Sequence, residues 1–482
     1  SSLSGKERAI INPATEEVIE HVPEAGPEDV DVAVGAARRA FQGWSRTDPD
    51  EKARILRDGI ARIKAEGKEI AELLTREQGK PLSEAMGELH HLLHGLEFYA
   101  DLASKIRGAY VPLPSTLGTS YGVVIKRPLG VVAAITPFNF PLTLLGTKIG
   151  PALVSGNTVV VKPSETTPLG TIRLIALLNE AGLPPGVLNV ITGAGPGAGE
   201  ALVGHPDVRR VAFTGGTRTG RRIMEIAGPK FKRITLELGG SDPVIICPDA
   251  DIEKAIKGIV IGRYFNAGQA CLAAKRVYIF QEVYDQVLEK LVKRVGRYEL
   301  GEGWTRAERP KIRMGPLHSA QTRERIRGQV QDALRRGARV AIGGDAPKER
   351  ERGFFFEPTV LENVPHDSRV VQDECFGPVL PLFKVKTINE AIRLANDSPY
   401  GLGSSVWTDN VKWIHKVAQE VEAGMTWVNQ LHYGYDELPF GGVKASGFGR
   451  EHGPEALDYY LESKSIVYGD LDIPDDPGED LQ

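Results

Sequence analysis

The sequence predicts an α/β fold made of two stacked units, each a largely parallel sheet covered by helices. From residue 121 onward, short β-branched runs such as 131–135 and 158–161 alternate with helical segments, and this alternation is typical of parallel strands with helical crossovers. Hydrophobic residues make up 41% and charged residues 25% of the 482 positions, a balance that argues against disordered, collagen-like and coiled-coil chains. This length allows roughly three domains, or two large ones.

The region before the sheets is expected to be mainly helical. Residues 27–102 show helical periodicity, with long amphipathic stretches at 29–44 and 50–78. Residues 108–126 instead predict a β-hairpin with little apolar face of its own, as expected of an arm that packs on another domain or subunit. The acidic tail at 470–482 is expected to be a loosely held terminus.

A boundary near residue 240 separates the two α/β units. The first unit is expected to contain strands at 131–135, 158–161, 187–191, 211–214 and 233–238, and helices at 170–181 and 220–227. The second is expected to contain a strand at 243–246, a helix at 252–264, a strand at 276–280 and a helix at 283–295, and to continue to about residue 407.

Charge and cysteine content restrict the partners. Lys plus Arg number 59 and Asp plus Glu 63, a net charge of −4, which leaves no overall positive footprint for nucleic acid or an anionic membrane. One long uncharged run, 128–147, has Pro137, Asn139 and Pro141 at its centre, so a membrane helix there would lose backbone hydrogen bonds. Three cysteines form an odd, sparse set, which indicates a reducing compartment, expected to be the cytoplasm.

Three glycine-rich stretches are candidate phosphate sites. Residues 193–199 match a dinucleotide fingerprint poorly and contain a proline, so a loop is expected there. Residues 213–220 follow a strand and open a helix, which would aim backbone N–H groups at an anion, although an ordinary strand-to-helix turn is the favoured interpretation of this stretch judged alone. Residues 441–447 give no specific phosphate signal. His90 and His94 lack the glutamate of a zinc motif, so no metal is expected.

Three side chains have contexts that suggest chemistry. Cys271 follows the small, turn-forming stretch 266–270, which could present a thiol at the mouth of a cleft, although a buried inert thiol is an equally good interpretation. Glu237 is a lone carboxylate between apolar neighbours at the end of an expected strand, and is either a solvent-facing charge or a base with a raised pKa. Asn139 places a polar amide in an apolar loop bracketed by prolines.

Taken together, these stretches resemble the aldehyde dehydrogenase superfamily along nearly the whole chain. Seven motifs in family order carry the resemblance: Pro-Phe-Asn-Phe-Pro at 137–141, Lys-Pro-Ser-Glu at 162–165, Phe-Thr-Gly at 213–215, Glu-Leu-Gly-Gly at 237–240, Gly-Gln-Ala-Cys at 268–271, Glu-Cys-Phe-Gly-Pro at 374–378, and Pro-Phe-Gly-Gly at 439–442 with Gly-Arg-Glu at 449–451. Seven motifs in order form a far more specific signal than a lone glycine pattern.

The resemblance implies a role for each candidate. Cys271 would attack the aldehyde as a thiolate, and the Asn139 side chain with the Cys271 backbone N–H would hold the resulting oxyanion. After hydride transfer to a nicotinamide, Glu237 would activate the water that hydrolyses the thioester and releases a carboxylic acid. Relatives that acylate CoA lack a glutamate at this position, so a non-acylating, hydrolytic outcome is expected.

A nicotinamide cofactor is implied by the same resemblance, with NAD favoured and NADP as the alternative. Lys162 and Glu165 would meet the adenosine ribose, and the carboxylate would repel a 2′-phosphate. Gly215 and Gly216 would face the diphosphate, and one contact is missing because the family commonly has serine at the second position. The full implied set is Thr136, Pro137, Phe138, Lys162, Ser164, Glu165, Phe213, Gly215, Gly216, Gly220, Leu238, Gly239, Glu374 and Phe376, the last two at the nicotinamide ribose and ring.

The implied substrate is an aldehyde with an aliphatic, aromatic or short hydroxylated body. Succinate-semialdehyde dehydrogenases of the superfamily carry arginines at positions matching Thr147 and Phe265, and this chain has neither, so a dicarboxylic semialdehyde is disfavoured. The channel would be mostly apolar and aromatic. Its implied lining is Phe140, Leu144, Phe265, Ala270, Leu272 and Phe440.

The resemblance also implies a division of the chain. Residues 1–107 and 131–240 would form a Rossmann-type NAD(P)-binding domain, and residues 241–440 the α/β catalytic domain. Residues 108–130 and 455–482 would supply a small β arm and a C-terminal strand and tail, which join subunits of a homodimer or homotetramer.

Two other functions stay open from the sequence alone. A Cys-His hydrolase could use Cys271 with a histidine such as His432 and no nucleotide, and a catalytically silent structural homologue would keep the fold without the chemistry. A phosphorylating glyceraldehyde-3-phosphate dehydrogenase is disfavoured because its Ser-Cys-Thr-Thr-Asn motif is absent.

Overall fold

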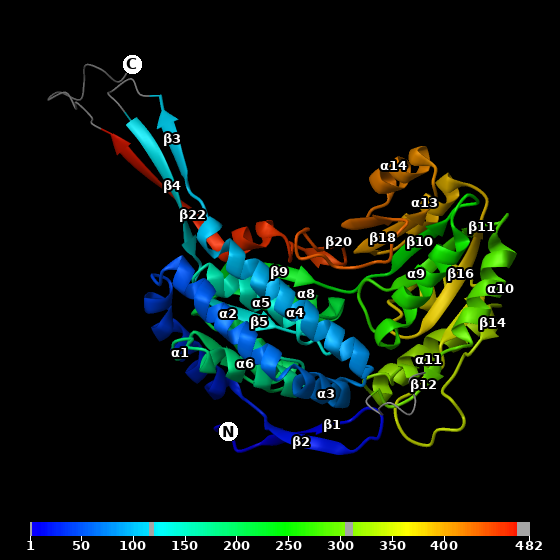
Figure 1. Ribbon diagram of the computed structural model, residues 1–482, viewed down its shortest axis with the longest axis horizontal. Helices are drawn as coiled ribbons and strands as arrows, with labels where there is room; N and C mark the ends of the chain where they lie inside the picture. Colours follow the sequence, from blue (N-terminus) through cyan, green and yellow to red (C-terminus); the bar gives the residue numbers. More distant parts are fainter. Residues whose placement is uncertain (1, 115–119, 304–311, 470–482) are drawn as a thin grey trace.

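The computed structural model describes residues 2–114, 120–303 and 312–469, and these form two mainly parallel sheets with a projecting arm (Figure 1). The α/β fold expected from the sequence is confirmed. The acidic tail at 470–482 lies outside the described residues.

The N-terminal region contains a hairpin that the sequence did not predict. Strands β1 (Glu7–Ile11) and β2 (Val18–Pro23) pair antiparallel. Four helices follow: α1 (Pro27–Trp44), α2 (Pro49–Ala65), α3 (Gly67–Gln78) and α4 (Leu82–Leu102). The prediction of one continuous helical stretch at 50–78 was wrong. The helix breaks at Glu66, whose φ of −100° and ψ of 15° lie outside helical geometry, and the next residue is a glycine, which has a low helix propensity.

The first sheet has its strands in the order β21-β9-β8-β5-β6-β7. They are β5 (Val131–Ile135), β6 (Thr158–Lys162), β7 (Leu188–Val190), β8 (Val208–Thr214), β9 (Arg233–Glu237) and β21 (Gly447–Phe448). The chain runs from β5 outward through β6 to β7, then returns to the other side of β5 for β8 and β9. In an open parallel sheet, the carboxyl ends at such a reversal form a crevice for ligands.

Helices connect the parallel strands of this unit. They are α5 (Thr143–Val154), α6 (Leu169–Glu180), α7 (Glu200–Gly204) and α8 (Thr217–Ala227). The loop expected at 193–199 was only partly right, because Gly195–Gly199 forms a π-helical turn that leads directly into α7. The uncharged run at 128–147 is divided between β5, an irregular loop and the start of α5.

The second sheet has the order β14-β15-β16-β11-β10-β18-β19. Its strands are β10 (Asp242–Ile246), β11 (Ala274–Phe280), β14 (Arg339–Ile342), β15 (Thr359–Glu362), β16 (Val379–Val385), β18 (Gly403–Trp407) and β19 (Met425–Val428), and only β14 runs antiparallel to its neighbour. The expected end near residue 407 was too early, because β19 extends the sheet by one strand.

The helices around the second sheet are α9 (Ile252–Tyr264), α10 (Tyr284–Val295), α11 (Ala320–Arg335), α12 (Arg369–Gln372), α13 (Ile388–Asn396) and α14 (Val411–Glu420). Short pairs complete it: β12 (Glu299–Leu300) with β13 (Ile312–Met314), and β17 (Tyr400–Gly401) with β20 (Val443–Lys444). Its core is a single apolar cluster built from the strands and their covering helices.

The arm consists of β3 (Ala109–Leu113), β4 (Ser120–Pro128) and β22 (Leu461–Gly469), which project from the body beside the described C-terminal end (Figure 1). Three tyrosines stack across it: the ring centroids of Tyr110 and Tyr121 are 5.4 Å apart, and those of Tyr121 and Tyr468 are 5.1 Å apart. All three are exposed, so the arm presents an aromatic face that no described residue of the chain covers.

The two sheets are joined where their opposite ends face one another. Strand β9 ends at Glu237 and β10 begins at Asp242, while β11 pairs with β10 from Ala274 onward. The carboxyl edge of the first sheet and the amino edge of the second therefore share a short link, and Cys271 precedes β11 at that edge.

Candidate active site

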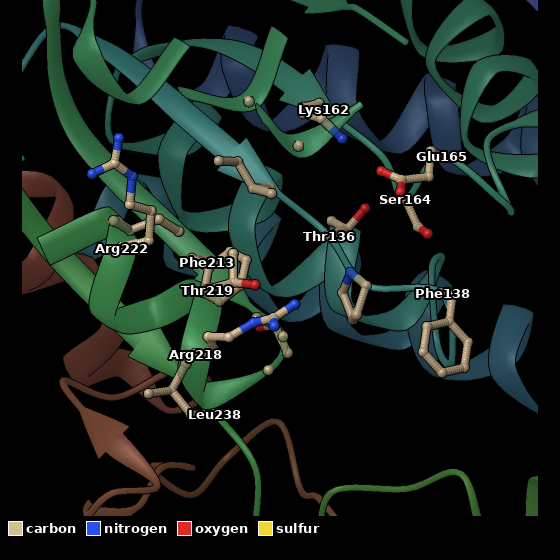
Figure 2. Close-up of a pocket in the computed structure, with 18 of the residues that line it drawn as sticks. Thr136, Phe138, Lys162, Ser164, Glu165, Phe213, Arg218, Thr219, Arg222 and Leu238 are labelled. Atoms are coloured by element: carbon tan, nitrogen blue, oxygen red, sulfur yellow. The ribbon is translucent and has the colours of Figure 1, made fainter. Parts of the chain in front are cut away.

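A cavity of about 740 Å³ lies at the carboxyl ends of β5, β6, β8 and β9, where the strand order of the first sheet reverses. Its wall combines residues from both α/β units, and Figure 2 shows part of the wall contributed by the first unit. The predicted site residues found in the wall are Thr136, Pro137, Phe138, Asn139, Lys162, Ser164, Glu165, Phe213, Gly215, Gly216, Leu238, Gly239, Cys271, Glu374 and Phe376.

Cys271 reaches this wall from a turn with unusual backbone geometry. Asn266 and Ala267 have φ of 51° and 53°, left-handed values that cost energy for residues with a side chain. The Asn266 side chain holds the turn by donating to the Asn139 carbonyl at 2.9 Å. Cys271 is partly buried, and burial raises the pKa of its thiol to about 12. The thiol is therefore protonated at neutral pH unless a base or a ligand removes the proton.

Asn139 faces the same turn from the loop after β5. Its side-chain Nδ2 donates to the Gln269 carbonyl at 3.1 Å, which places the amide beside the residues that lead to Cys271. One N–H of the amide is used in this bond, and the other is left for a further acceptor. The nucleophile and the oxyanion donor predicted from the sequence thus lie in adjacent, mutually bonded loops.

A buried ion pair stands behind Asn139. Lys80 bonds to Glu88, and both side chains are completely buried. The Lys80 ammonium also donates to the Asn139 carbonyl at 2.7 Å, while Glu88 accepts from the backbone N–H of Leu142 at 2.8 Å. The pair therefore contacts the loop at Asn139 and again three residues later, at Leu142.

Glu237 ends β9 in a buried position, with only 3% of its surface exposed. Within the described ranges, neither of its carboxyl oxygens has a hydrogen-bond partner. Burial first, and then the nearby Glu451 carboxylate, hold the pKa of Glu237 well above its usual range, while Lys148 opposes them. Lys148 itself bonds to Glu451 at 2.7 Å. Glu237 is therefore buried rather than solvent-facing, and it does not line the cavity.

One end of the cavity carries balanced charges. Lys162 and Glu165 lie beside each other there (Figure 2), and the Lys162 ammonium donates to the Pro163 carbonyl at 3.0 Å. Burial lowers the pKa of Lys162, whereas Glu165 and Glu24 raise it. Arg8, from the unpredicted hairpin, forms a two-armed ion pair with Glu24 at 2.6 and 3.0 Å.

The middle of the cavity lies at the start of α8. Gly216 is the residue that precedes this helix, and a side chain at 216 would meet open space. Arg218 and Arg222, one helical turn apart, also line the cavity on the side away from Glu165 (Figure 2), and sequence reasoning missed both. Gly220 does not line it: a Cβ there would lie 2.6 Å from Leu238, so this glycine serves helix packing.

The far end of the cavity is built from the second sheet. Glu374 Oε1 accepts from Lys275 Nζ at 2.8 Å and from Gly240 N–H at 3.0 Å. The ring of His318 stacks on Phe138 with centroids 3.5 Å apart, and burial lowers the pKa of His318 to about 3. His318 belongs to none of the sequence motifs, so only its position in the folded structure shows that it lines the cavity.

The six predicted substrate residues lie outside this cavity. Phe140 and Phe265 stack at 5.9 Å, and Phe440 lies 5.5 Å from His452. Leu144 is buried, and the Thr147 hydroxyl on the same helix donates to Glu451 at 2.8 Å. Ala270 and Leu272 flank Cys271 directly. Of the six residues predicted to line one substrate channel, Phe140 and Phe265 are in contact with each other.

The sequence profile of the aldehyde dehydrogenase family matches residues 1–466. The chain belongs to the aldehyde dehydrogenase family. It is 40% identical over 471 residues to the mitochondrial succinate-semialdehyde dehydrogenase of Arabidopsis thaliana, which covers 98% of this chain and 88% of that protein. It is 38% identical over 467 residues to the NADP(+) succinate-semialdehyde dehydrogenase of Escherichia coli, covering 97% and 95%.

The fold is similar to solved structures of the same family. Betaine aldehyde dehydrogenase from Staphylococcus aureus, in complex with NAD+, superposes with a TM-score of 0.93 at 39% identity, covering 97% of this chain and 92% of that one. The protein is thus an oxidoreductase of a family that acts on aldehydes with NAD or NADP. In the part of the chain that the structure describes, no helix could span a membrane, and no group of ligating side chains could hold a metal ion.

Proposed function

We propose that this aldehyde dehydrogenase oxidises an aldehyde to its carboxylic acid through Cys271, with Asn139 as oxyanion donor and Glu237 as base. One observation supports this most: Cys271 and Asn139 share the wall of a single cavity with the charged and glycine positions that a dinucleotide needs. The loops that carry the two side chains are hydrogen-bonded to each other, so their relative position is fixed before any substrate arrives.

The first step forms a bond between Cys271 Sγ and the carbonyl carbon of the aldehyde. The thiol must lose its proton first, and because its pKa is about 12, only a small fraction is thiolate at neutral pH. The aldehyde oxygen becomes an oxyanion, and the free N–H of the Asn139 amide is available to bind it. The product is a thiohemiacetal on Cys271.

The cavity is suited to NAD or NADP. Its volume, the helix N-terminus at Gly216 and the two arginines on α8 suit a diphosphate, and Lys162 with Glu165 would hold the adenosine ribose. Glu374 and Phe376 would hold the nicotinamide ribose and ring. Hydride acceptance is the chemistry that a nicotinamide held there would supply, and Cys271 would then carry the acyl group as a thioester.

Hydrolysis of the thioester is the step assigned to Glu237. A carboxyl group with a strongly raised pKa is a better base than an ordinary one once it is deprotonated. Its lack of hydrogen-bond partners in the described residues leaves both oxygens free to bind a water. The water would attack the thioester carbon, release the acid and return the thiol.

NAD is the cofactor that the charges favour. A 2′-phosphate on the adenosine ribose would lie near Glu165, whereas the nearby Glu24 is already paired with Arg8. The Glu165 carboxylate can accept hydrogen bonds from the ribose hydroxyls but would repel a 2′-phosphate. Replacing Glu165 removes this carboxylate and tests the preference.

We propose an aliphatic, aromatic or short hydroxylated aldehyde as substrate. The stacked pair Phe140 and Phe265 offers an apolar surface next to the Asn139 loop. The Thr147 hydroxyl donates to Glu451. Neither Thr147 nor Phe265 offers a positive charge to a second carboxylate of the substrate. A dicarboxylic semialdehyde would lack a counter-charge here, although two relatives carry that activity in their names.

The same proposal extends to assembly and to the division of labour in the chain. The tyrosines exposed on the arm are suited to contact with a second copy of this chain, as a homodimer or homotetramer. Residues 1–107 and 131–240 are assigned to cofactor binding and 241–440 to catalysis, in a reducing compartment such as the cytoplasm.

The decisive experiment is an aldehyde panel with NAD and NADP, read by the absorbance of the reduced cofactor. We expect turnover with apolar aldehydes, none with Cys271→Ala, and an accumulated acyl-enzyme by intact mass with Glu237→Gln. Oxidation by Cys271→Ala would refute the nucleophile assignment.

The hydrolase alternative predicts a different result in the same panel, ester turnover without any cofactor signal. His432 gives it little support: its Nδ1 bonds to the Leu272 carbonyl at 3.0 Å, and its ring stacks on Trp427 at 4.7 Å. The side chain is thus committed to packing.

A further inference from the structure

Lys275 lies outside the sequence motifs, yet its side chain is buried between the Cys271 turn and the cavity. The ammonium donates to the Cys271 carbonyl at 2.7 Å, to the Gly240 carbonyl at 2.7 Å and to Glu374 Oε1 at 2.8 Å. An ammonium has three N–H donors, so these three acceptors use all of them. Only 1% of the side chain is exposed, and water cannot replace the contacts.

These bonds fix one oxygen of Glu374 and leave the other open. Oε1 is held by Lys275 and by the Gly240 N–H, whereas Oε2 has no recorded hydrogen bond to the described residues. Oε2 faces Gly239, where a side chain would collide with it. The carboxylate is therefore anchored through one oxygen and presents the other to the cavity wall that it lines.

The charge of Lys275 also acts on the thiol. Of the charged groups around Cys271, Lys275 lowers the pKa of the thiol, whereas Glu237, Glu374 and Asp242 raise it. Three carboxylates and one ammonium surround a group that must become an anion. Lys275 is the attractive charge among these four groups, so its removal would make the thiolate harder to form.

We propose that Lys275 is a positioning residue that ties the Cys271 turn to Glu374, so that thiolate formation and cofactor-ribose binding depend on the same ammonium. The inference rests on the function proposed above and deepens it. A purely structural lysine would affect folding alone, whereas this one affects the titration of the thiol and the affinity for NAD.

The first test is the pH profile of Cys271 alkylation by iodoacetamide, without cofactor, read by intact mass and peptide mapping. We expect Lys275→Met to slow alkylation roughly tenfold at pH 8, as a shift of about one pKa unit predicts. Glu374→Gln should shift the profile the opposite way, because it removes a repelling carboxylate. Lys275→Gln keeps a hydrogen-bond donor without the charge, so its alkylation profile should resemble that of Lys275→Met. If Lys275→Met does not fold, Lys275→Gln is measured in its place.

The second test is the dissociation constant for NAD by titration calorimetry. We expect Lys275→Met to weaken binding about tenfold, and Lys275→Gln to weaken it less because its amide can still hold Oε1. The matched control is Lys52→Met, which removes another buried lysine on α2, far along the chain, and should change neither readout.

The outcomes separate the two proposals. A lowered melting temperature for Lys275→Met, with the alkylation profile and the NAD dissociation constant both within twofold of the unmodified protein, would overturn the role of Lys275. Aldehyde oxidation by Cys271→Ala would instead overturn the proposed function.

Discussion

Replacing Lys80 by methionine should weaken both the fold and the chemistry. Lys80 and Glu88 are completely buried partners, and the substitution keeps the volume while it removes the charge. Glu88 would retain the backbone N–H groups of Leu142 and Thr143, at 2.8 and 3.3 Å, but no cation. The Asn139 carbonyl would lose one donor and keep the Asn266 amide at 2.9 Å.

The expected cost follows from these contacts. Breaking a buried ion pair by removing one partner destabilises proteins by about 3–5 kcal/mol, because the remaining charge is left uncompensated. The surviving donors to Glu88 and Asn139 place Lys80→Met toward the lower end of this range. Since the loop that carries the Asn139 side chain would also lose the Lys80 contact to its carbonyl, kcat should fall while the dissociation constant for NAD changes little.

Urea unfolding followed by tryptophan fluorescence, with a parallel kcat measurement, checks both effects. The double variant Lys80→Met with Glu88→Gln should recover most of the stability, because glutamine still accepts from Leu142 without an unpaired charge. It should recover little of the turnover, since the contact to Asn139 remains absent. A loss below about 1 kcal/mol for Lys80→Met, or a double variant as unstable as the single one, would refute the reasoning.

Three further predictions concern the site itself. Asn139→Ala should lower kcat by roughly 10²- to 10³-fold with unchanged NAD affinity by calorimetry; an unaffected kcat would exclude the oxyanion role. Glu165→Ser should raise the ratio of kcat/KM with NADP to that with NAD, and a constant ratio would contradict the charge argument. Because the pKa values of Cys271, about 12, and Glu237 are both raised, deprotonation activates each group, so kcat/KM should climb from pH 6 to pH 9; a profile that falls over this range would contradict these protonation states.

The sequence predicted the elements whose pattern is local. Strand β5 is a run of five buried residues between turn signals. The observed bounds of α6 differ from the expected ones by only one residue at each end, because its leucines repeat at helical spacing. The β1–β2 hairpin was missed because β1 buries only Ile10 fully, which leaves no period to detect. The break at Glu66 was missed because amphipathic periodicity continues across it.

The candidate site was predictable where one short motif carries the chemistry. Cys271 and Asn139 stand in such motifs, and both reach the cavity. Residues that act through distant neighbours have no such signal: Lys80 and Lys275 matter because the fold brings them to the Asn139 and Cys271 carbonyls. Gly220 shows the converse error, since its motif resembles a phosphate loop while its actual neighbour is Leu238.

Glu237 is buried without a hydrogen-bond partner in the described residues, so stability and turnover should favour different residues at this position. A buried polar group without a hydrogen bond costs about 1–3 kcal/mol, and within the described ranges this carboxyl has none. An apolar residue of similar size at 237 would remove that cost. A mutant library screened only for survival after heating should therefore become enriched in leucine or methionine at this position, whereas a library screened for product should keep the glutamate.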